Sequence, residues 1–82
     1  MHPAEAFPLS EYLLDEMRAR GWSPADFARY SRCSEARMRA ILSGDPPWLC
    51  EVLEMAKAIG CSATMLIDME QTYRRWHDAQ AL

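Results

Sequence analysis

The sequence has few of the features that membrane-spanning, secreted or phosphate-binding proteins require. Only three glycines occur among its 82 residues, so no glycine-rich loop for holding phosphate groups is present. The longest stretch without a charged residue runs from Ala58 to Ile67, well short of the roughly 20 apolar residues that cross a bilayer. Residues 1–5 include no basic segment and precede no long apolar run, so we expect no secretory signal and no membrane contact. These absences predict a cytoplasmic protein.

Cysteine and histidine are also too few to indicate a metal site, a disulfide framework or a catalytic centre. The spacing of Cys33, Cys50 and Cys61 fits neither paired zinc knuckles nor a set of disulfides. We predict that all three are reduced, buried and small apolar side chains. His2 and His77 have no cysteine or glutamate at a ligand spacing, so we expect no metal and no cofactor. Without a nucleophile pattern, a chain of this length is not expected to be an enzyme.

Charge is distributed unevenly along the chain. The net charge is −3, with an isoelectric point near 5.2. Residues 17–44 nevertheless hold six arginines against two acids, a local charge of +4, while the rest of the chain sums to −7. Local charge steers association more than net charge does, so the basic middle favours contact with nucleic acid. The acidic ends suit a basic protein partner.

Helix start and stop signals divide the chain into five short segments. No segment shows the alternation of apolar and polar residues that is typical of a strand. Four serines are placed to cap helices that begin just after them: Ser10, Ser23, Ser34 and Ser62. Three glycines follow helical segments and are placed to end them: Gly21, Gly44 and Gly60. We therefore predict one all-α domain of five helices over residues 1–82. Residues 1–8 are predicted to be a terminal arm, and the sequence leaves open whether this arm is ordered or flexible.

Two neighbouring segments are expected to form a helix-turn-helix over residues 23–43. The first begins with a strong signal, since Ser23 is placed at the N-cap, Pro24 at the first helical position and Asp26 at the third. The second runs from Ser34 to Leu42 after a turn of only three residues. In this motif the second helix enters the major groove of DNA, with its first residues against the base edges.

Helical spacing indicates which side chains of the second helix would face DNA. With Met38, Ile41 and Leu42 buried, the remaining positions face solvent at various angles. An exposed arginine here pairs with guanine, binds phosphate or only solvates the surface, and the spacing does not choose between these roles. Glu35 either accepts a hydrogen bond from cytosine or supports the helix dipole. The predicted DNA contacts are Ser23, Arg29, Arg32, Ser34, Glu35, Ala36, Arg37, Arg39, Ala40 and Ser43.

A fourth helical segment is expected at about residues 49–59. The last helical segment, residues 63–78, is longer than is needed to cover it. Apolar side chains recur along it at helical spacing, and those in its first half are as consistent with the core as with an interface. Aromatic side chains near a chain end often anchor a dimer or a partner protein. The predicted interface residues are Met69, Tyr73 and Trp76.

The sequence resembles the lambda-repressor-like (XRE) helix-turn-helix family. The residues that carry the resemblance are Ser23-Pro24-Ala25-Asp26-Phe27-Ala28-Arg29, residues 34–44 and residues 53–62. Within that family it is similar to HigA-type antitoxins over residues 8–13, at Gly21-Trp22-Ser23 and over residues 65–73. The resemblance covers about residues 8–76. It implies a lambda-repressor-like fold and a homodimer that binds a palindromic operator in double-stranded DNA, represses its own operon and neutralises a toxin protein.

Four positions depart from the residues usual in that family. Pro24 stands where glutamine is usual, and Asp45 replaces a basic residue that often follows the second helix. Ser31 and Arg32 stand where leucine and glycine are usual. These departures favour an alternative hypothesis, a protein-interaction module that keeps the helix-turn-helix fold with weak or no DNA binding. The two hypotheses are compatible, because an antitoxin binds both DNA and a protein.

Overall fold

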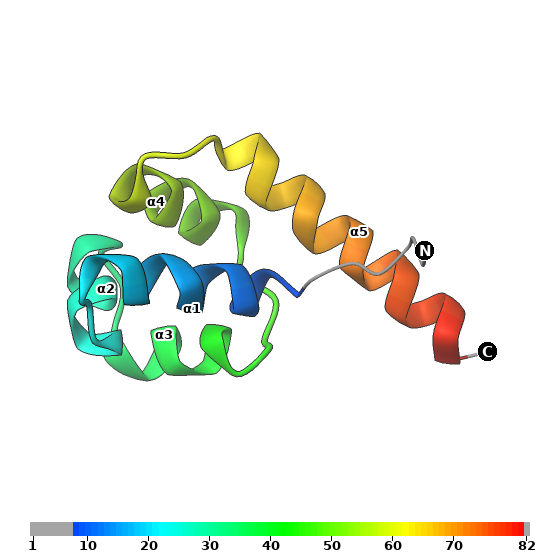
Figure 1. Ribbon diagram of the computed structural model, residues 1–82, viewed down its shortest axis with the longest axis horizontal. Helices are drawn as coiled ribbons and strands as arrows, with labels where there is room; N and C mark the ends of the chain where they lie inside the picture. Colours follow the sequence, from blue (N-terminus) through cyan, green and yellow to red (C-terminus); the bar gives the residue numbers. More distant parts are fainter. Residues whose placement is uncertain (1–7, 82) are drawn as a thin grey trace.

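Five helices account for most of the residues that the structure, a computed structural model, describes, which are residues 8–81 (Figure 1). The helices are α1 (Leu9–Arg20), α2 (Pro24–Tyr30), α3 (Glu35–Leu42), α4 (Leu49–Ile59) and α5 (Ala63–Ala81). No strand forms between residues 8 and 81, which confirms the all-α prediction. Within the same range, no helix has the length and apolar character needed to cross a membrane. Apart from Pro8, the predicted arm at residues 1–8 lies outside the described residues.

The capping signals around the α2–α3 segment are confirmed. The Oγ atom of Ser23 accepts a hydrogen bond from the backbone N–H of Asp26 at 3.1 Å. The Asp26 carboxylate accepts one from the Ser23 N–H at 2.9 Å, which completes a capping box and lowers the pKa of Asp26. Ser34 caps α3 in the same manner, since its Oγ accepts from the N–H of Arg37 at 3.1 Å. The N-terminal starts of both helices are therefore fixed by local sequence.

Helix α1 begins two residues earlier than its serine predicts. Pro8 occupies the N-cap in an extended conformation, with φ −61° and ψ 145°, and Ser10 lies inside the first turn. The predicted cap at Ser10 is therefore wrong. Proline suits a helix start because its φ is fixed and it has no N–H to satisfy. At the other end Gly21 adopts a left-handed conformation, as its predicted role in ending the helix requires.

A single core joins all five helices. Figure 1 shows α1 running through the middle of the molecule, with α3 on one side of it and α4 on the other. Each helix contributes at least one large side chain with no exposed surface: Leu13, Phe27, Met38, Met55 and Leu66. Burying a side chain of this kind stabilises a fold by about 1.5–3 kcal/mol. The core thus fixes α3 against α1 and α2 and leaves its other side free.

The second half of α5 extends away from this core (Figure 1). Leu66 is fully buried, and Ile67 and Met69 pack against the core residues. Farther along, Tyr73 and Trp76 are half-buried but are not part of the core cluster. The helix therefore has an inner half that supports the fold and an outer half that carries aromatic side chains beyond it.

The three cysteines are free, and two of them are partly covered. Cys33 and Cys61 are half-buried, and burial raises the pKa of both thiols. Cys50 is exposed in the first turn of α4, so the prediction that all three are buried is wrong for this residue. Helical spacing explains the difference, because Val52 and Met55 supply the buried face of α4 and Cys50 lies off it.

Candidate nucleic-acid interface

One side of α3 is free of core contacts. Met38 and Ile41 are buried on the inner side, as the spacing predicts. On the outer side Glu35, Ala36, Arg39 and Ser43 are exposed, and Ala40 is half-buried at the edge. At about 100° per residue these five positions occupy a single face, which we call the outer face of α3. It is the surface that a helix-turn-helix would present to a DNA groove.

Arg39 is the one arginine on the outer face, and Glu35 holds it. The Oε2 atom of Glu35 accepts hydrogen bonds from Arg39 Nε at 2.9 Å and from Nη2 at 2.6 Å. The two side chains remain 60% and 47% exposed, so both lie within reach of a ligand. Ala36 and Ala40 stand beside them, and their small side chains allow the helix backbone to approach another surface closely.

Arg29 lies in the last turn of α2, and Arg32 lies in the turn between α2 and α3. Arg29 forms an exposed ion pair with Asp26 at 3.3 Å, and its guanidinium lies 5.1 Å from the ring centre of Tyr30. Arg32 is exposed and has no ion-pair partner among residues 8–81. Exposed ion pairs are weak because water and salt screen them, so a phosphate can replace the carboxylate at Arg29. Both guanidinium groups are therefore available to an anionic backbone.

The hydroxyl groups of Ser23 and Ser34 can each donate a hydrogen bond in addition to capping a helix. In both, the Oγ atom accepts a backbone hydrogen bond, which leaves the hydroxyl hydrogen free to donate. Both serines are exposed, and they stand at the starts of α2 and α3. A phosphate oxygen at either position would accept from the hydroxyl.

Arg37 does not lie on the outer face of α3. Its guanidinium points to the start of α4, where Nε donates to Glu51 Oε2 at 2.8 Å and Nη2 donates to Oε1 at 3.0 Å. Nη2 also donates to the carbonyl oxygen of Pro46 at 3.0 Å, and Nη1 lies 3.6 Å from Asp45 Oδ2. The expectation that Arg37 faces solvent is therefore wrong, and the residue connects α3 to α4.

Glu51 is the centre of this connection, and the sequence analysis did not single it out. Its Oε1 atom also accepts the N–H of Trp48 at 2.8 Å, which satisfies the backbone donor of the N-cap residue of α4. The hydrogen bonds from Arg37 hold the pKa of Glu51 below its ordinary value, against the effect of burial. Asp45, the departure from the family residue, lies beside the same guanidinium. A glutamate three residues after Trp48, the position just before the expected helix, was the available signal.

The turn between α2 and α3 contains the one non-glycine residue between positions 8 and 81 with a positive φ. This residue is Arg32, at φ 60°, where the family that the sequence resembles usually has glycine. A side chain in this conformation brings Cβ close to the following carbonyl oxygen, at a cost of roughly 1–2 kcal/mol. The turn is therefore strained at the residue that offers the free guanidinium.

We expect Arg32→Gly to stabilise the protein and, under the hypothesis that this turn contacts phosphate, to weaken DNA binding. Removing Cβ relieves the strain, and a gain of about 1 kcal/mol would raise the melting temperature by roughly 4–8 °C in a domain of this size. Loss of a phosphate contact would reduce the slope of log affinity against log salt concentration by about 1. Thermal unfolding and a salt titration measure the two effects, and a lower melting temperature would contradict the first.

Ser31 is the one buried polar side chain whose oxygen lacks a hydrogen-bond partner in the described part of the chain. It is 2% exposed and follows the last residue of α2. We expect Ser31→Ala to stabilise the protein by about 1 kcal/mol. The substitution removes a hydroxyl that gives up its hydrogen bonds to water on folding and gains no partner within the protein. Urea unfolding checks this through a higher midpoint with an unchanged slope. A lower midpoint would show that the hydroxyl is satisfied.

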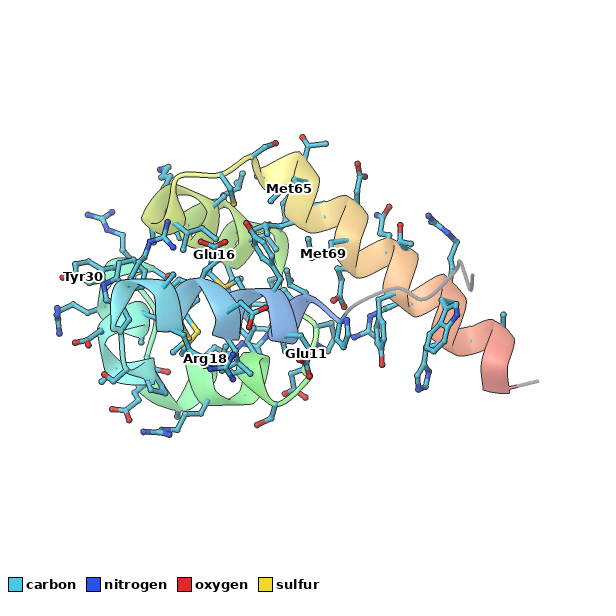
Figure 2. The ribbon with its side chains drawn as sticks, in the orientation of Figure 1. Glu11, Glu16, Arg18, Tyr30, Met65 and Met69 are labelled. Atoms are coloured by element: carbon cyan, nitrogen blue, oxygen red, sulfur yellow. The ribbon has the colours of Figure 1, made fainter. Side chains whose placement is uncertain are left out.

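The predicted interface residues of α5 separate into two groups. Met69 packs against the core, on a stretch of α5 shown in Figure 2, and so serves the fold first. Tyr73 and Trp76 lie beyond the core with their ring centres 6.0 Å apart. The ring centre of Tyr73 also lies 5.8 Å from that of His77, with the two rings tilted by 41°. The outer half of α5 therefore carries the aromatic surface that the sequence predicts.

A second apolar surface lies at the start of α4 and was missed by the sequence analysis. Trp48, Leu49 and Leu53 are 68%, 62% and 45% exposed. The Trp48 ring centre lies 5.1 Å from the Arg37 guanidinium, which connects this surface to α3. Exposed apolar side chains on one face, such as Leu49 and Leu53 one helical turn apart, are typical of protein contacts. The two leucines are four residues apart, a spacing that was the available signal.

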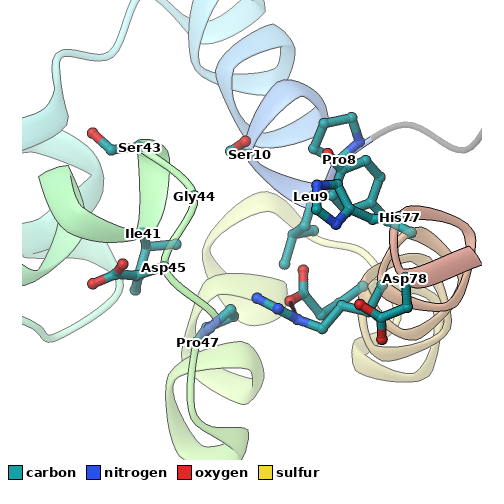
Figure 3. Close-up of a pocket in the computed structure, with 13 residues that line it drawn as sticks. Pro8, Leu9, Ser10, Ile41, Ser43, Gly44, Asp45, Pro47, His77 and Asp78 are labelled. Atoms are coloured by element: carbon teal, nitrogen blue, oxygen red, sulfur yellow. Dashed lines mark hydrogen bonds and ion pairs between the residues drawn. The ribbon is translucent and has the colours of Figure 1, made fainter. Parts of the chain in front are cut away.

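A cleft of about 400 Å³ separates the end of α3 from the outer half of α5 (Figure 3). The start of α1 closes one side of it, and the loop after α3 forms another. Its ionisable lining consists of Asp45, Glu70, Arg74, His77 and Asp78. Carboxylates outnumber the guanidinium there, so this cleft differs in charge from the outer face of α3 and is unsuited to phosphate.

Comparison of the chain with protein-family models, curated proteins and solved structures gives no match. The resemblance to the XRE family therefore stays a prediction that rests on the residues quoted for it. The geometry described above stands independently of that resemblance.

Proposed function

We propose that this protein is a sequence-specific DNA-binding regulator with a lambda-repressor-like helix-turn-helix, and that α3 enters the major groove. The observation that carries the proposal is the outer face of α3. It is free of core contacts, begins at a capped helix start, and combines one arginine with small neighbouring side chains. Groove contact requires a helix of this kind, held firmly from behind.

The positions of the charged side chains support this proposal. Arg39 on the outer face is placed to contact a base edge. Arg29 in the last turn of α2 and Arg32 in the turn between α2 and α3 are placed to contact the phosphate backbone. Arg37 is assigned to the fold because its donors are directed to Glu51 and Pro46. The DNA surface is thus less basic than the count of arginines suggests, and binding should depend moderately on salt.

The proposed regulator acts as a homodimer on a palindromic operator. Tyr73 and Trp76 offer the contact surface, because they lie on the outer half of α5 and outside the core cluster. A two-fold dimer would place two copies of α3 about 34 Å apart, which matches two half-sites one helical turn apart. Repression of its own operon would then follow from binding upstream of its own gene.

Selection from a pool of random DNA duplexes tests the proposal without assuming an operator. We expect enrichment of a palindrome whose half-site centres are about 10 base pairs apart. A single enriched half-site would contradict the dimer, and a pool without any enriched sequence would contradict sequence-specific binding. The selected duplex then serves as the operator in the experiments below.

A second candidate function is binding of a basic protein, as an antitoxin binds its toxin. The apolar surface of Trp48, Leu49 and Leu53 favours it, together with the acidic charge outside residues 17–44. Co-expression with a small basic protein encoded by an adjacent gene tests this function. Formation of a stable complex that Trp48→Ala weakens would support it, and two proteins that elute separately would contradict it.

A further inference from the structure

The contact between Glu35 and Arg39 leaves one edge of the guanidinium open. A guanidinium has a side edge, formed by Nε and Nη2, and an end edge, formed by Nη1 and Nη2. The Oε2 atom of Glu35 occupies the side edge, with distances of 2.9 Å and 2.6 Å. No other hydrogen-bond or ion-pair partner of Arg39 occurs among residues 8–81, so the end edge faces solvent. Two parallel N–H donors are what guanine O6 and N7 accept in the major groove.

We infer that Glu35 is a positioning residue for base recognition, and that it directs the end edge of Arg39 toward a guanine in each half-site. This inference rests on the proposed DNA-binding function. It names the base that the outer face of α3 recognises and the residue that sets the preference. Glu35 acts through Arg39, and its carboxylate need not touch DNA.

Two physical effects of Glu35 make the recognition selective. A long arginine side chain samples many rotamers, and a contact that holds it in one orientation reduces the freedom lost on binding a base. The carboxylate also repels phosphates and partly neutralises the arginine, which weakens binding to DNA of any sequence. Glu35 therefore lowers overall affinity and raises the preference for guanine.

The alternative role for Glu35 is stabilisation of the helix dipole. Glu35 is the first residue of α3, where a carboxylate interacts favourably with the helix start. That role would affect the stability of α3 and leave base preference unchanged. The ratio of affinities for two duplexes therefore separates the two roles, whereas a melting temperature does not.

The decisive experiment compares the parent protein with Glu35→Gln on the selected operator and on a duplex in which the guanine is replaced. We expect the preference for guanine to fall about two- to threefold, because an exposed pair at this spacing contributes only about 0.3–0.5 kcal/mol, and the affinity for a scrambled duplex to rise. Glu35→Asp keeps the charge but shortens the side chain. It should lose the preference for guanine without gaining affinity for the scrambled duplex. In an Arg39→Ala background, Glu35→Gln should change the preference no further.

Glu54→Gln is the matched control, because it makes the same substitution on α4, where Glu54 pairs with Lys57 at 3.9 Å. It should leave the preference for guanine unchanged. An unchanged preference in Glu35→Gln, with operator binding intact, would overturn the inference and leave the proposed function standing. Failure of the parent protein to bind the selected operator would overturn the proposed function itself, and the inference with it.

Discussion

Replacing Glu51 with alanine is expected to lower the melting temperature of the protein by roughly 10 °C. The substitution removes the carboxylate that accepts from Nε and Nη2 of Arg37 and from the N–H of Trp48. The Glu51 side chain is only 12% exposed, so the donors that it leaves behind are poorly placed to find water. Thermal unfolding at neutral pH, followed by circular dichroism, measures the loss.

The effect of Glu51 should also depend on pH. Hydrogen bonds from Arg37 lower the pKa of Glu51 in the folded protein below its ordinary value of 4.5. Its contribution to stability is therefore complete above pH 4.5 and is lost as the pH falls through the lower, folded value. The melting temperatures of the parent and of Glu51→Ala should converge in that acid range. Equal melting temperatures at pH 7 would contradict the role assigned to Glu51.

A glutamate in an exposed ion pair provides the control for Glu51. Glu35→Gln removes a carboxylate whose side chain is 47% exposed, and water replaces the contact at little cost. We expect its melting temperature to stay within about 2 °C of the parent value. A loss as large as that of Glu51→Ala would show that exposure does not distinguish the two pairs.

Replacing Trp76 with glutamate is expected to abolish the proposed dimer and to reduce affinity for the proposed palindromic operator by a factor of about 100 or more. A charge at this position would be buried between two copies of α5 without a partner. Two linked binding domains gain about 10²–10⁴-fold in affinity over one, and a monomer forfeits that gain. Sedimentation measures the oligomeric state, and titration of full and half operators measures the affinity. The affinity for a single half-site should stay unchanged.

Gln71→Glu is the matched control for Trp76→Glu. It introduces the same charge on the same helix, but five positions away, on the side of α5 opposite Tyr73 and Trp76. This variant should remain a dimer. A Trp76→Glu protein that sediments as a dimer and binds the full operator normally would show that α5 is not the dimer contact.

Much of the fold follows from short-range signals in the sequence. The capping box at Ser23 and Asp26, the cap at Ser34 and the left-handed Gly21 each involve residues within four positions of one another. Such contacts form wherever the local sequence allows them, so spacing predicts them well. The error at the first helix arose because Pro8 and Ser10 are both acceptable starts two residues apart, and their spacing does not choose between them.

The candidate site was predictable only where it depends on one helix. The outer face of α3, with Glu35 and Arg39 four residues apart, follows from helical periodicity. The orientation of the Arg37 side chain depends instead on Glu51, which is 14 positions away in the sequence. Glu51 reaches Arg37 only after α3 and α4 have packed together. The strain at Arg32 is likewise a property of the packed turn. Tertiary contacts therefore decide which arginines remain free for a ligand.

Titration of the purified protein against DNA from upstream of its own gene tests the central claim most directly. The measurement uses a labelled duplex and a scrambled control at several salt concentrations. We predict tight binding to the upstream duplex alone, with a salt slope that corresponds to a few phosphate contacts from residues such as Arg29 and Arg32. Equal or undetectable binding to both duplexes near physiological salt would contradict sequence-specific recognition by α3.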